Sequence, residues 1–166
     1  MSPRRVSENV VREVPLLRSQ APVGSAVQQL LDSGEVALPV IDDRERFAGV
    51  FGEREFLGAL FPGYLKEIAY AGFVPKGLEE VFEKRAQCAT DPIAEHMLTE
   101  HVDVGPDHSD LQVAETFIHH RVLITPVVDE GRVLGVITRT DFFRSLAASF
   151  RDSTAISDVA PKDIRQ

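Results

Sequence analysis

The chain has few of the features that accompany secretion or membrane insertion. It has one cysteine, Cys88, so no internal disulfide can form, which fits a reducing compartment. The basic start over residues 1–5 is not followed by an apolar run of signal-peptide length. No stretch approaches the roughly 18 consecutive apolar residues of a transmembrane helix. We therefore expect a cytoplasmic protein that does not contact a membrane.

Basic side chains are also in the minority. The 166 residues include 18 Lys and Arg against 26 Asp and Glu, which gives a formal net charge of -8. Proteins that bind nucleic acid usually carry a basic face, so we expect no nucleic-acid partner. Apolar residues make up 43% of the chain, enough for a soluble globular domain with a substantial core.

The motifs that accompany catalysis are missing as well. The chain has no Gly-x-x-x-x-Gly-Lys phosphate loop, no Gly-x-Ser-x-Gly elbow and no dinucleotide-binding glycine fingerprint. The five histidines have no zinc-like spacing with Cys88, so no metal site is expected. We expect a protein that is not an enzyme and requires no cofactor. An enzyme of another type stays open, because a perturbed acid or base in a pocket cannot be recognised from sequence.

The chain contains an internal repeat. Leu38–Asp42 (LPVID) matches Thr125–Asp129 (TPVVD), with the two prolines 87 positions apart. Each segment is followed by a polar turn, an apolar run that contains glycine, and a helical pattern, and a helical pattern also precedes each. Each copy therefore reads as a βαββα unit. One unit has too few strands to enclose a core, so we expect both units to form one mixed α/β globule about a pseudo-two-fold axis.

Residue ranges follow from these patterns. Strands are expected at 14–17, 38–42, 47–51, 101–104, 125–129 and 133–137, and helices at 23–32, 53–61, 78–85, 109–120 and 139–150. The first repeat spans 10–62, a helical segment 63–95, the second repeat 96–150 and a flexible tail 151–166. Because proline lacks an N–H group, Pro39 and Pro126 are expected at strand starts or on an edge.

The segment between the repeats has two interpretations. A helical stripe runs over 61–68, and Asp91 followed by Pro92 is typical of an N-cap with proline at the first helical position. These helices either cover the sheets and complete the core, which is the commoner case, or contact a subunit or partner.

The second copy ends in a motif that could bind a ligand. Thr138 and Asp141, three residues apart at the start of a helix, form the pattern of a capping box, which by itself only predicts a helix start. A helix start after a strand also presents free N–H groups and positive potential to a crevice. There a carboxylate suits the paired hydroxyls of a ribose, and a hydroxyl suits a ribose or phosphate oxygen.

The order Thr-Pro-Val-Val-Asp, turn, Val-Leu-Gly-Val-Ile-Thr-Arg-Thr-Asp resembles the cystathionine-β-synthase (CBS) domain family, and two copies resemble a Bateman module. The resemblance implies a regulatory module that binds an adenosyl nucleotide (AMP, ADP, ATP or S-adenosylmethionine), forms a homodimer and acts on a separate protein. It assigns Thr138 and Asp141 to ribose and phosphate. It assigns the backbone of Thr125, Pro126 and Val127 to the base.

The phosphate contacts and the first copy are less regular. Arg139 lies beside Thr138, and His119 and His120 end a helix, so these are candidate phosphate contacts. The first copy has Gly52 and Glu55 where the family has Thr and Asp, with Pro39 as the strand proline. We predict that this first site is degenerate or prefers another ligand. The departure keeps open the alternative that the chain is a ligand-free dimerisation or interaction scaffold.

Overall fold

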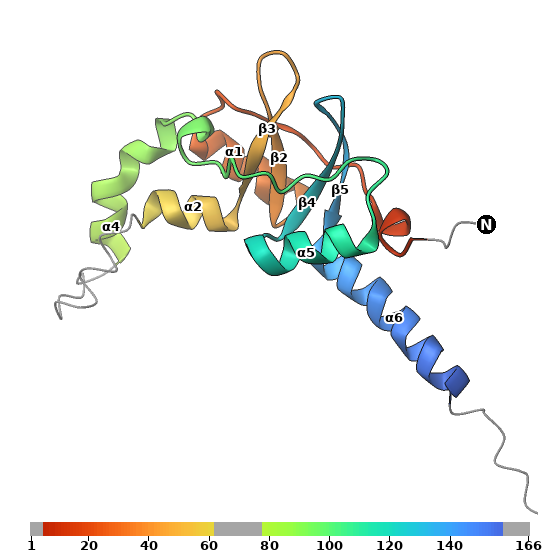
Figure 1. The fold of residues 1–166 in the computed structure, drawn as a ribbon. Helices are drawn as coiled ribbons and strands as arrows, with labels where there is room; N and C mark the ends of the chain where they lie inside the picture. Colours follow the sequence, from red (N-terminus) through yellow and green to blue (C-terminus); the bar gives the residue numbers. More distant parts are fainter. Residues whose placement is uncertain (1–4, 62–77, 158–166) are drawn as a thin grey trace, which may run out of the picture.

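The computed structural model describes residues 5–61 and 78–157, and Figure 1 shows how its elements are arranged. The first part contains η1 (Ser7–Val10), β1 (Leu17–Arg18), α1 (Val23–Ser33), β2 (Ala37–Ile41), β3 (Phe47–Gly52) and α2 (Glu53–Leu60). The second contains α4 (Leu78–Arg85), η2 (Ala86–Thr90), η3 (Ile93–Glu95), α5 (Asp110–His120), β4 (Ile124–Asp129), β5 (Arg132–Thr138) and α6 (Arg139–Ser157). The two predicted βαββα repeats and the mixed α/β class are confirmed.

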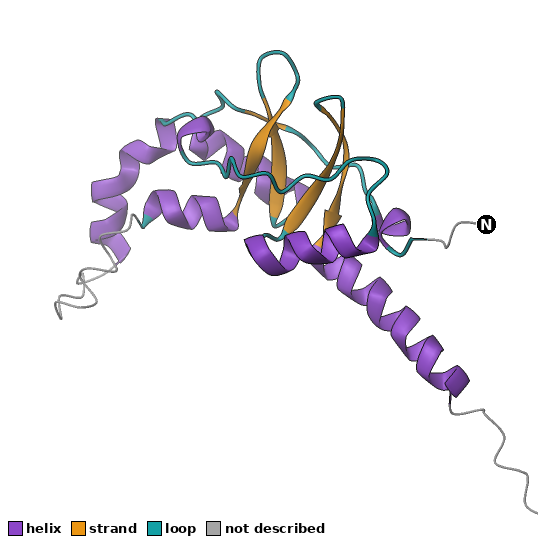
Figure 2. Ribbon diagram, in the orientation of Figure 1, coloured by secondary structure: helices purple, strands orange, loops and turns teal. Residues whose placement is uncertain are grey.

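Two hairpins form the centre of the molecule, with helices around them (Figure 2). Strand β2 pairs antiparallel with β3 and parallel with β1, and β4 pairs antiparallel with β5. The Phe47 N–H donates to the Gly131 carbonyl at 2.7 Å, which joins the tips of the hairpins. Gly131 has φ +82°, a turn conformation that glycine adopts without steric cost.

The segments that lead into the two repeats are exchanged. Arg12 precedes the first repeat's strands but pairs with Val136 in β5, through hydrogen bonds of 2.9 and 2.8 Å. Leu98 precedes the second repeat's strands but pairs with Val50 in β3, at 3.0 and 2.8 Å. We call residues 5–14 and 91–100 the lead-in segments. Each lead-in segment completes the sheet of the other repeat, which gives the pseudo-two-fold arrangement its physical basis.

The glycine in each apolar run is explained by this exchange. A Cβ atom at Gly135 would lie 2.7 Å from the Arg12 carbonyl oxygen, and one at Gly49 would overlap the Leu98 carbonyl oxygen. A backbone crossing this close leaves no room for a side chain. The repeated glycine therefore marks the point where the exchanged segment crosses each sheet.

The core is shared between the repeats, as one globule requires. Ala37 and Val50 of the first repeat belong to the same buried cluster as Ile124, Val136 and Phe142 of the second. Ile93, from the second lead-in segment, lies in the cluster built by the first repeat.

The first lead-in segment is anchored by Asp110 at the start of α5. Its carboxylate accepts the Val6 and Ser7 N–H groups at 2.9 and 2.8 Å, and also the Ser7 hydroxyl. Burial by itself would raise the pKa of the Asp110 carboxyl, but the hydrogen bonds from Ser7 and Val6 outweigh it and lower that pKa. His108 also contacts the Ser7 hydroxyl, at 3.0 Å, while its other ring nitrogen contacts the Gly105 carbonyl. Since Ser7 is fully buried and Asp110 does not orient the imidazole, this is an anchor and not a nucleophilic triad.

Several expected elements differ from those observed. The helix predicted to start at Asp91 is only the short 3-10 helix η3, and Pro92, with extended backbone, is its N-cap. The N–H groups of Ile93 and Ala94 donate to Ala21 and Ser19, so docking onto the first repeat holds this segment. Helix α6 continues to Ser157, through part of the predicted tail, and the stripe over 61–68 lies almost entirely outside the described residues.

One of the two strand prolines lies elsewhere than expected. Pro39 pairs with Val50 inside β2, the central strand of its sheet, so its placement at a strand start or edge was wrong. Pro126 pairs with Val136 inside β4, which is an edge strand of the two-stranded sheet, as expected. On the outer side of β4, Val104 makes a single bridge, accepting from Val128 N–H and donating to the Pro126 carbonyl. Because the segment that contains Val104 makes only this one bridge, it does not require an N–H group at Pro126. The strand predicted over 101–104 is reduced to the same bridge.

Replacing Gly135 by Ala should destabilise the protein by about 1–3 kcal/mol, because the new methyl group would collide with the Arg12 backbone. Urea unfolding of both variants measures the effect. Gly58→Ala is the control, since its Cβ would meet nothing within 4 Å and should stabilise α2 by about 0.4–1 kcal/mol. Equal stability of the two variants would contradict the crossing.

Candidate functional site

The predicted ligand motif lies where β5 passes into α6. Thr138 ends β5 and is 6% exposed, and its hydroxyl oxygen accepts the Asp141 N–H at 3.1 Å. The Arg139 N–H donates to the Leu123 carbonyl at 2.9 Å, which ties the start of α6 to the residue directly before β4. The helix start is therefore capped as the sequence predicts, and Thr138 and Asp141 lie together.

The Asp141 carboxylate has a cationic partner that the sequence analysis did not name. Arg12 Nε lies 3.0 Å from Asp141 Oδ2, and the same guanidinium binds Glu35 through two hydrogen bonds, the shorter 2.7 Å. The hydrogen bond to Glu35, with the charges of Glu35 and Asp141, raises the pKa of Arg12. Three repeat-derived segments thus meet here: the first lead-in segment, the end of α1 and the start of α6.

Sequence reasoning missed Arg12 and Glu35 because neither belongs to the repeat that holds the motif. Arg12 arrives through the exchanged lead-in segment, and Glu35 follows α1 of the first repeat. The glycine of the apolar run was the available signal, since it indicates a close backbone crossing, but it does not identify the segment that crosses. Neither residue could be inferred without the topology.

Strand β4 supplies a wall whose backbone is largely paired. The Pro126 carbonyl accepts from Val104 N–H at 2.9 Å, and Val127 pairs with Gly135. Thr125 is fully buried, and among the described residues its hydroxyl is a buried side-chain group with no hydrogen-bond partner. An unpaired buried hydroxyl costs about 1–3 kcal/mol. Among Thr125, Pro126 and Val127, Thr125 therefore has the side-chain group that remains free to form a hydrogen bond.

The candidate phosphate contacts are separated by the fold. Arg139 is exposed beside Thr138. His120, in contrast, lies at the end of α5, where Arg54 at the start of α2 reaches its carbonyl at 3.5 Å. The end of α5 thus lies beside the first repeat's motif. His119 and His120 pair with Glu115 and Glu100, at 3.8 and 3.0 Å.

The first repeat's motif keeps the helix cap but has no hydroxyl. The Gly52 N–H donates to Glu55 Oε2 at 3.0 Å, and burial raises the pKa of the Glu55 carboxyl. A Cβ atom at Gly52 would lie 2.5 Å from the Ala37 Cβ, so a threonine does not fit there. The first site is therefore a capped helix start without the hydroxyl–carboxylate pair.

Two surface hollows lie away from this motif. One, of about 600 Å³, lies between α5 and residues 103–105 and includes His119 and His120 in its lining. The other, of about 570 Å³, follows an apolar face of α6 formed by Phe143, Leu146 and Phe150. Thr138 and Asp141 line neither.

The family model for the CBS domain matches residues 6–62 and 93–148, which is more than half of the chain. The chain belongs to the CBS domain family and contains two copies of the domain. Both matched ranges begin a few residues before the predicted repeats at 10 and 96, because they take in part of each lead-in segment.

Similar proteins extend this finding. The uncharacterized protein MJ1225 of Methanocaldococcus jannaschii is 23% identical over 145 residues, which cover 87% of this chain and 44% of that protein. The chain thus spans less than half the length of this relative. Across residues 5–61 and 78–157, the structure has no helix whose length and apolar character would let it cross a membrane.

Solved structures share the fold. The structure of CBSX2 has a TM-score of 0.63 and 18% identity, and the match covers 89% of this chain and 99% of that one. A CBS domain-containing protein from Bacillus anthracis has a TM-score of 0.64 and 18% identity, with 86% and 92% of the two chains covered. At these identities the likeness shows the tandem CBS fold alone.

The raised pKa of Glu55 predicts a pH dependence of stability. A carboxyl whose pKa is higher in the folded state gains stability as the pH falls through the range just above its ordinary value of 4.5. The stability of the wild type relative to Glu55→Gln should therefore rise between pH 7 and pH 5 in urea unfolding. Glu53→Gln, exposed in the same turn, is the control for lost charge. A difference that stays constant with pH would refute the assignment.

Proposed function

We propose that this chain is a regulatory module that binds an adenosyl nucleotide at the start of α6 and acts on a separate protein in the cytoplasm. CBS domains are regulatory modules, and CBSX2 has been solved in complex with AMP. The observation that carries the proposal is the grouping of the Thr138 hydroxyl, the Asp141 carboxylate and the Arg12 guanidinium at one helix start.

Asp141 is suited to a ribose. Arg12 contacts its Oδ2, so the second carboxylate oxygen can accept a ribose hydroxyl without breaking the ion pair. The carboxylate is 29% exposed, so a ligand can reach it, and the ion pair limits its rotation. A hydrogen bond to a charged group contributes about 1.5–3 kcal/mol.

Arg12 gives the site a positive charge close to the proposed ribose position. Its guanidinium is held by two carboxylates, and it is 45% exposed, so it can exchange the Glu35 contact for a phosphate oxygen. This favours ligands that carry phosphate over adenosine. Together with Arg139, it would supply the cationic part of the site.

The exchanged lead-in segment supplies a mechanism of regulation. Arg12 belongs to the first lead-in segment and Asp141 to the second repeat. A ligand that contacts both residues therefore favours one arrangement of that segment relative to the second repeat. Such a ligand shifts the population only by its difference in affinity for the two arrangements. Nucleotide binding would then change how the two repeats are arranged, and the partner protein would respond to that change.

A second function, as a dimerisation scaffold, is favoured by the apolar face of α6. Phe143, Leu146 and Phe150 are 66%, 44% and 67% exposed and lie on one side of the helix. Soluble monomers rarely leave a contiguous apolar face open, so we propose that a second copy of the chain packs against α6. A homodimer is compatible with nucleotide binding, and it would remain if nucleotide binding failed.

Asp141→Ala should weaken AMP binding by about tenfold or more, because the acceptor for the ribose hydroxyls is lost. Isothermal titration calorimetry gives the affinity, and thermal unfolding without ligand should show a folded protein, since a part-exposed ion pair contributes little. Arg12→Gln should instead reduce the preference for AMP over adenosine.

The matched control is Glu55→Ala, which removes the corresponding acid from the first repeat and should leave AMP affinity at α6 unchanged. No thermal shift with AMP, ATP or S-adenosylmethionine would reject nucleotide binding and leave the scaffold function. A site filled at 100 times its dissociation constant adds about 2.7 kcal/mol, which such an assay detects.

The double variant Phe143→Asp, Phe150→Asp should convert a dimer to a monomer, because charges would enter the apolar contact on α6. Sedimentation equilibrium measures the mass. Leu31→Asp is the control, since Leu31 is 69% exposed on α1 and does not line the hollow along α6. A wild-type monomer, or a dimer that survives the double variant, would reject this interface.

A further inference from the structure

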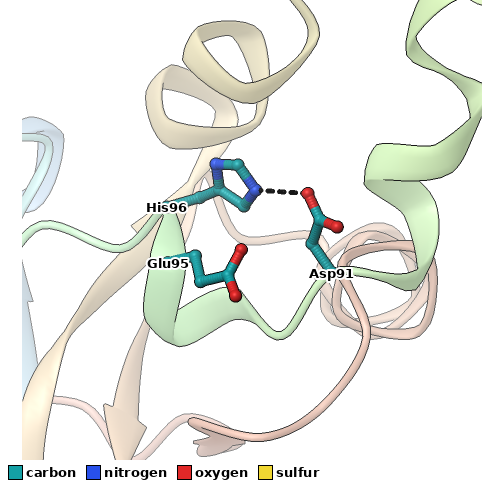
Figure 3. Close-up of side chains that lie close together, drawn as sticks. All are labelled: Asp91, Glu95 and His96. Carbon is teal, nitrogen blue, oxygen red and sulfur yellow. Dashed lines mark hydrogen bonds and ion pairs between the residues drawn. The ribbon is translucent and has the colours of Figure 1, made fainter.

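Three metal-binding side chains converge where the second lead-in segment begins. Asp91, Glu95 and His96 each offer a ligand atom, and these atoms all lie within 4.8 Å of one another. His96 Nε2 lies 3.0 Å from Asp91 Oδ2, and Figure 3 shows Glu95 beside this pair. The three residues come from a single turn, so they form a compact cluster of one nitrogen and two carboxylate donors.

The backbone that carries the cluster is held in place. The Asp91 carbonyl accepts the Val23 N–H at the start of α1 at 2.9 Å, and the Ile93 N–H donates to Ala21 at 2.9 Å. Ile93, between the ligand residues, is fully buried in the first repeat's core. Within the turn, the His96 N–H donates to the Ile93 carbonyl at 2.9 Å. The backbone that carries the ligand residues is therefore in place before any ion arrives, which lowers the cost of binding.

Among the described residues, no arginine or lysine side chain pairs with the cluster. Within residues 5–61 and 78–157, neither Asp91 nor Glu95 has an Arg or Lys ion-pair partner, and the Glu95 carboxylate accepts no hydrogen bond. The carboxylates at the other motif differ, because Asp141 and Glu35 share Arg12. Two carboxylates that meet at an imidazole, with no Arg or Lys ion-pair partner, favour a bound positive ion.

We propose that Asp91, Glu95 and His96 bind a divalent transition-metal ion of the Zn²⁺ type. One imidazole and two carboxylates are a ligand set that Zn²⁺ accepts at about 2.0–2.2 Å, with water at a fourth position. Ca²⁺ and Mg²⁺ prefer all-oxygen sites, so the imidazole selects against them. Glu95 is exposed and free to rotate, and its rotation closes the remaining distance.

The ion would act at the junction between the repeats. The turn that holds all three ligands is also the turn that docks on Ala21 and Val23 of the first repeat. Binding to the folded protein stabilises it by linkage, so Zn²⁺ would strengthen the attachment of the second lead-in segment. This site is independent of the nucleotide motif at α6.

The test is a Zn²⁺ titration of the full chain, in competition with a chromophoric chelator. We expect one ion per chain from this site, and Glu95→Gln should weaken it by at least about tenfold. The Glu95 side chain is exposed and makes no hydrogen bond or ion pair, so this variant should remain folded. The matched control is Glu100→Gln. It breaks the His120–Glu100 pair, which has the same 3.0 Å spacing but lacks a third ligand, and it should leave Zn²⁺ affinity unchanged.

Co²⁺ provides a second readout that does not depend on affinity alone. Co²⁺ bound through His96 should give visible d–d absorption that His96→Gln abolishes and excess Ca²⁺ does not displace. The proposal is overturned if the wild type binds no Zn²⁺, if Glu95→Gln binds as tightly as the wild type, or if Glu100→Gln weakens binding equally.

Discussion

The exchange of the two lead-in segments is the interaction on which the rest of the structure depends. Four backbone hydrogen bonds, between Arg12 and Val136 and between Leu98 and Val50, complete each sheet with the segment that precedes the other repeat. The glycines at 49 and 135 are required by this crossing. Because Ile93 is then buried in the first repeat's core, neither repeat has a complete interior alone.

The exchange also gives the two helix-start motifs different neighbours. The lead-in residue that crosses β5 is Arg12, whereas its counterpart across β3 is Leu98, which carries no charge. The strand end in the second repeat is Thr138, whereas that in the first is Gly52, where the approach of Ala37 excludes a side chain. The first repeat therefore has neither the strand-end hydroxyl nor a lead-in cation that crosses its sheet. The two helix starts therefore differ in chemistry on a pseudo-symmetric backbone.

Much of the fold was predictable because it depends on local patterns that occur twice. The Pro-Val strands, the glycine-containing runs and the amphipathic helices defined the βαββα units, and Thr138 and Asp141 were found because a helix cap is a short-range signal. Arg12 was not predicted, since its contact with Asp141 crosses more than a hundred residues and leaves no local pattern. Glu35 was missed with it, because Glu35 joins the site through Arg12. The helix expected at Asp91 failed for a related reason: tertiary hydrogen bonds to Ala21 and Ser19 hold that segment instead.

The pseudo-symmetric crossing has a consequence for the ancestry of the fold. A chain half as long, with one lead-in segment and one βαββα unit, could satisfy the same backbone hydrogen bonds by trading that segment with an identical neighbour. Two such chains would form a swapped dimer with the present architecture. Fusion of their genes would preserve every contact while allowing the two copies to mutate separately. Divergence such as that between Thr138 and Gly52 becomes possible only after that fusion, since identical chains must change both positions at once.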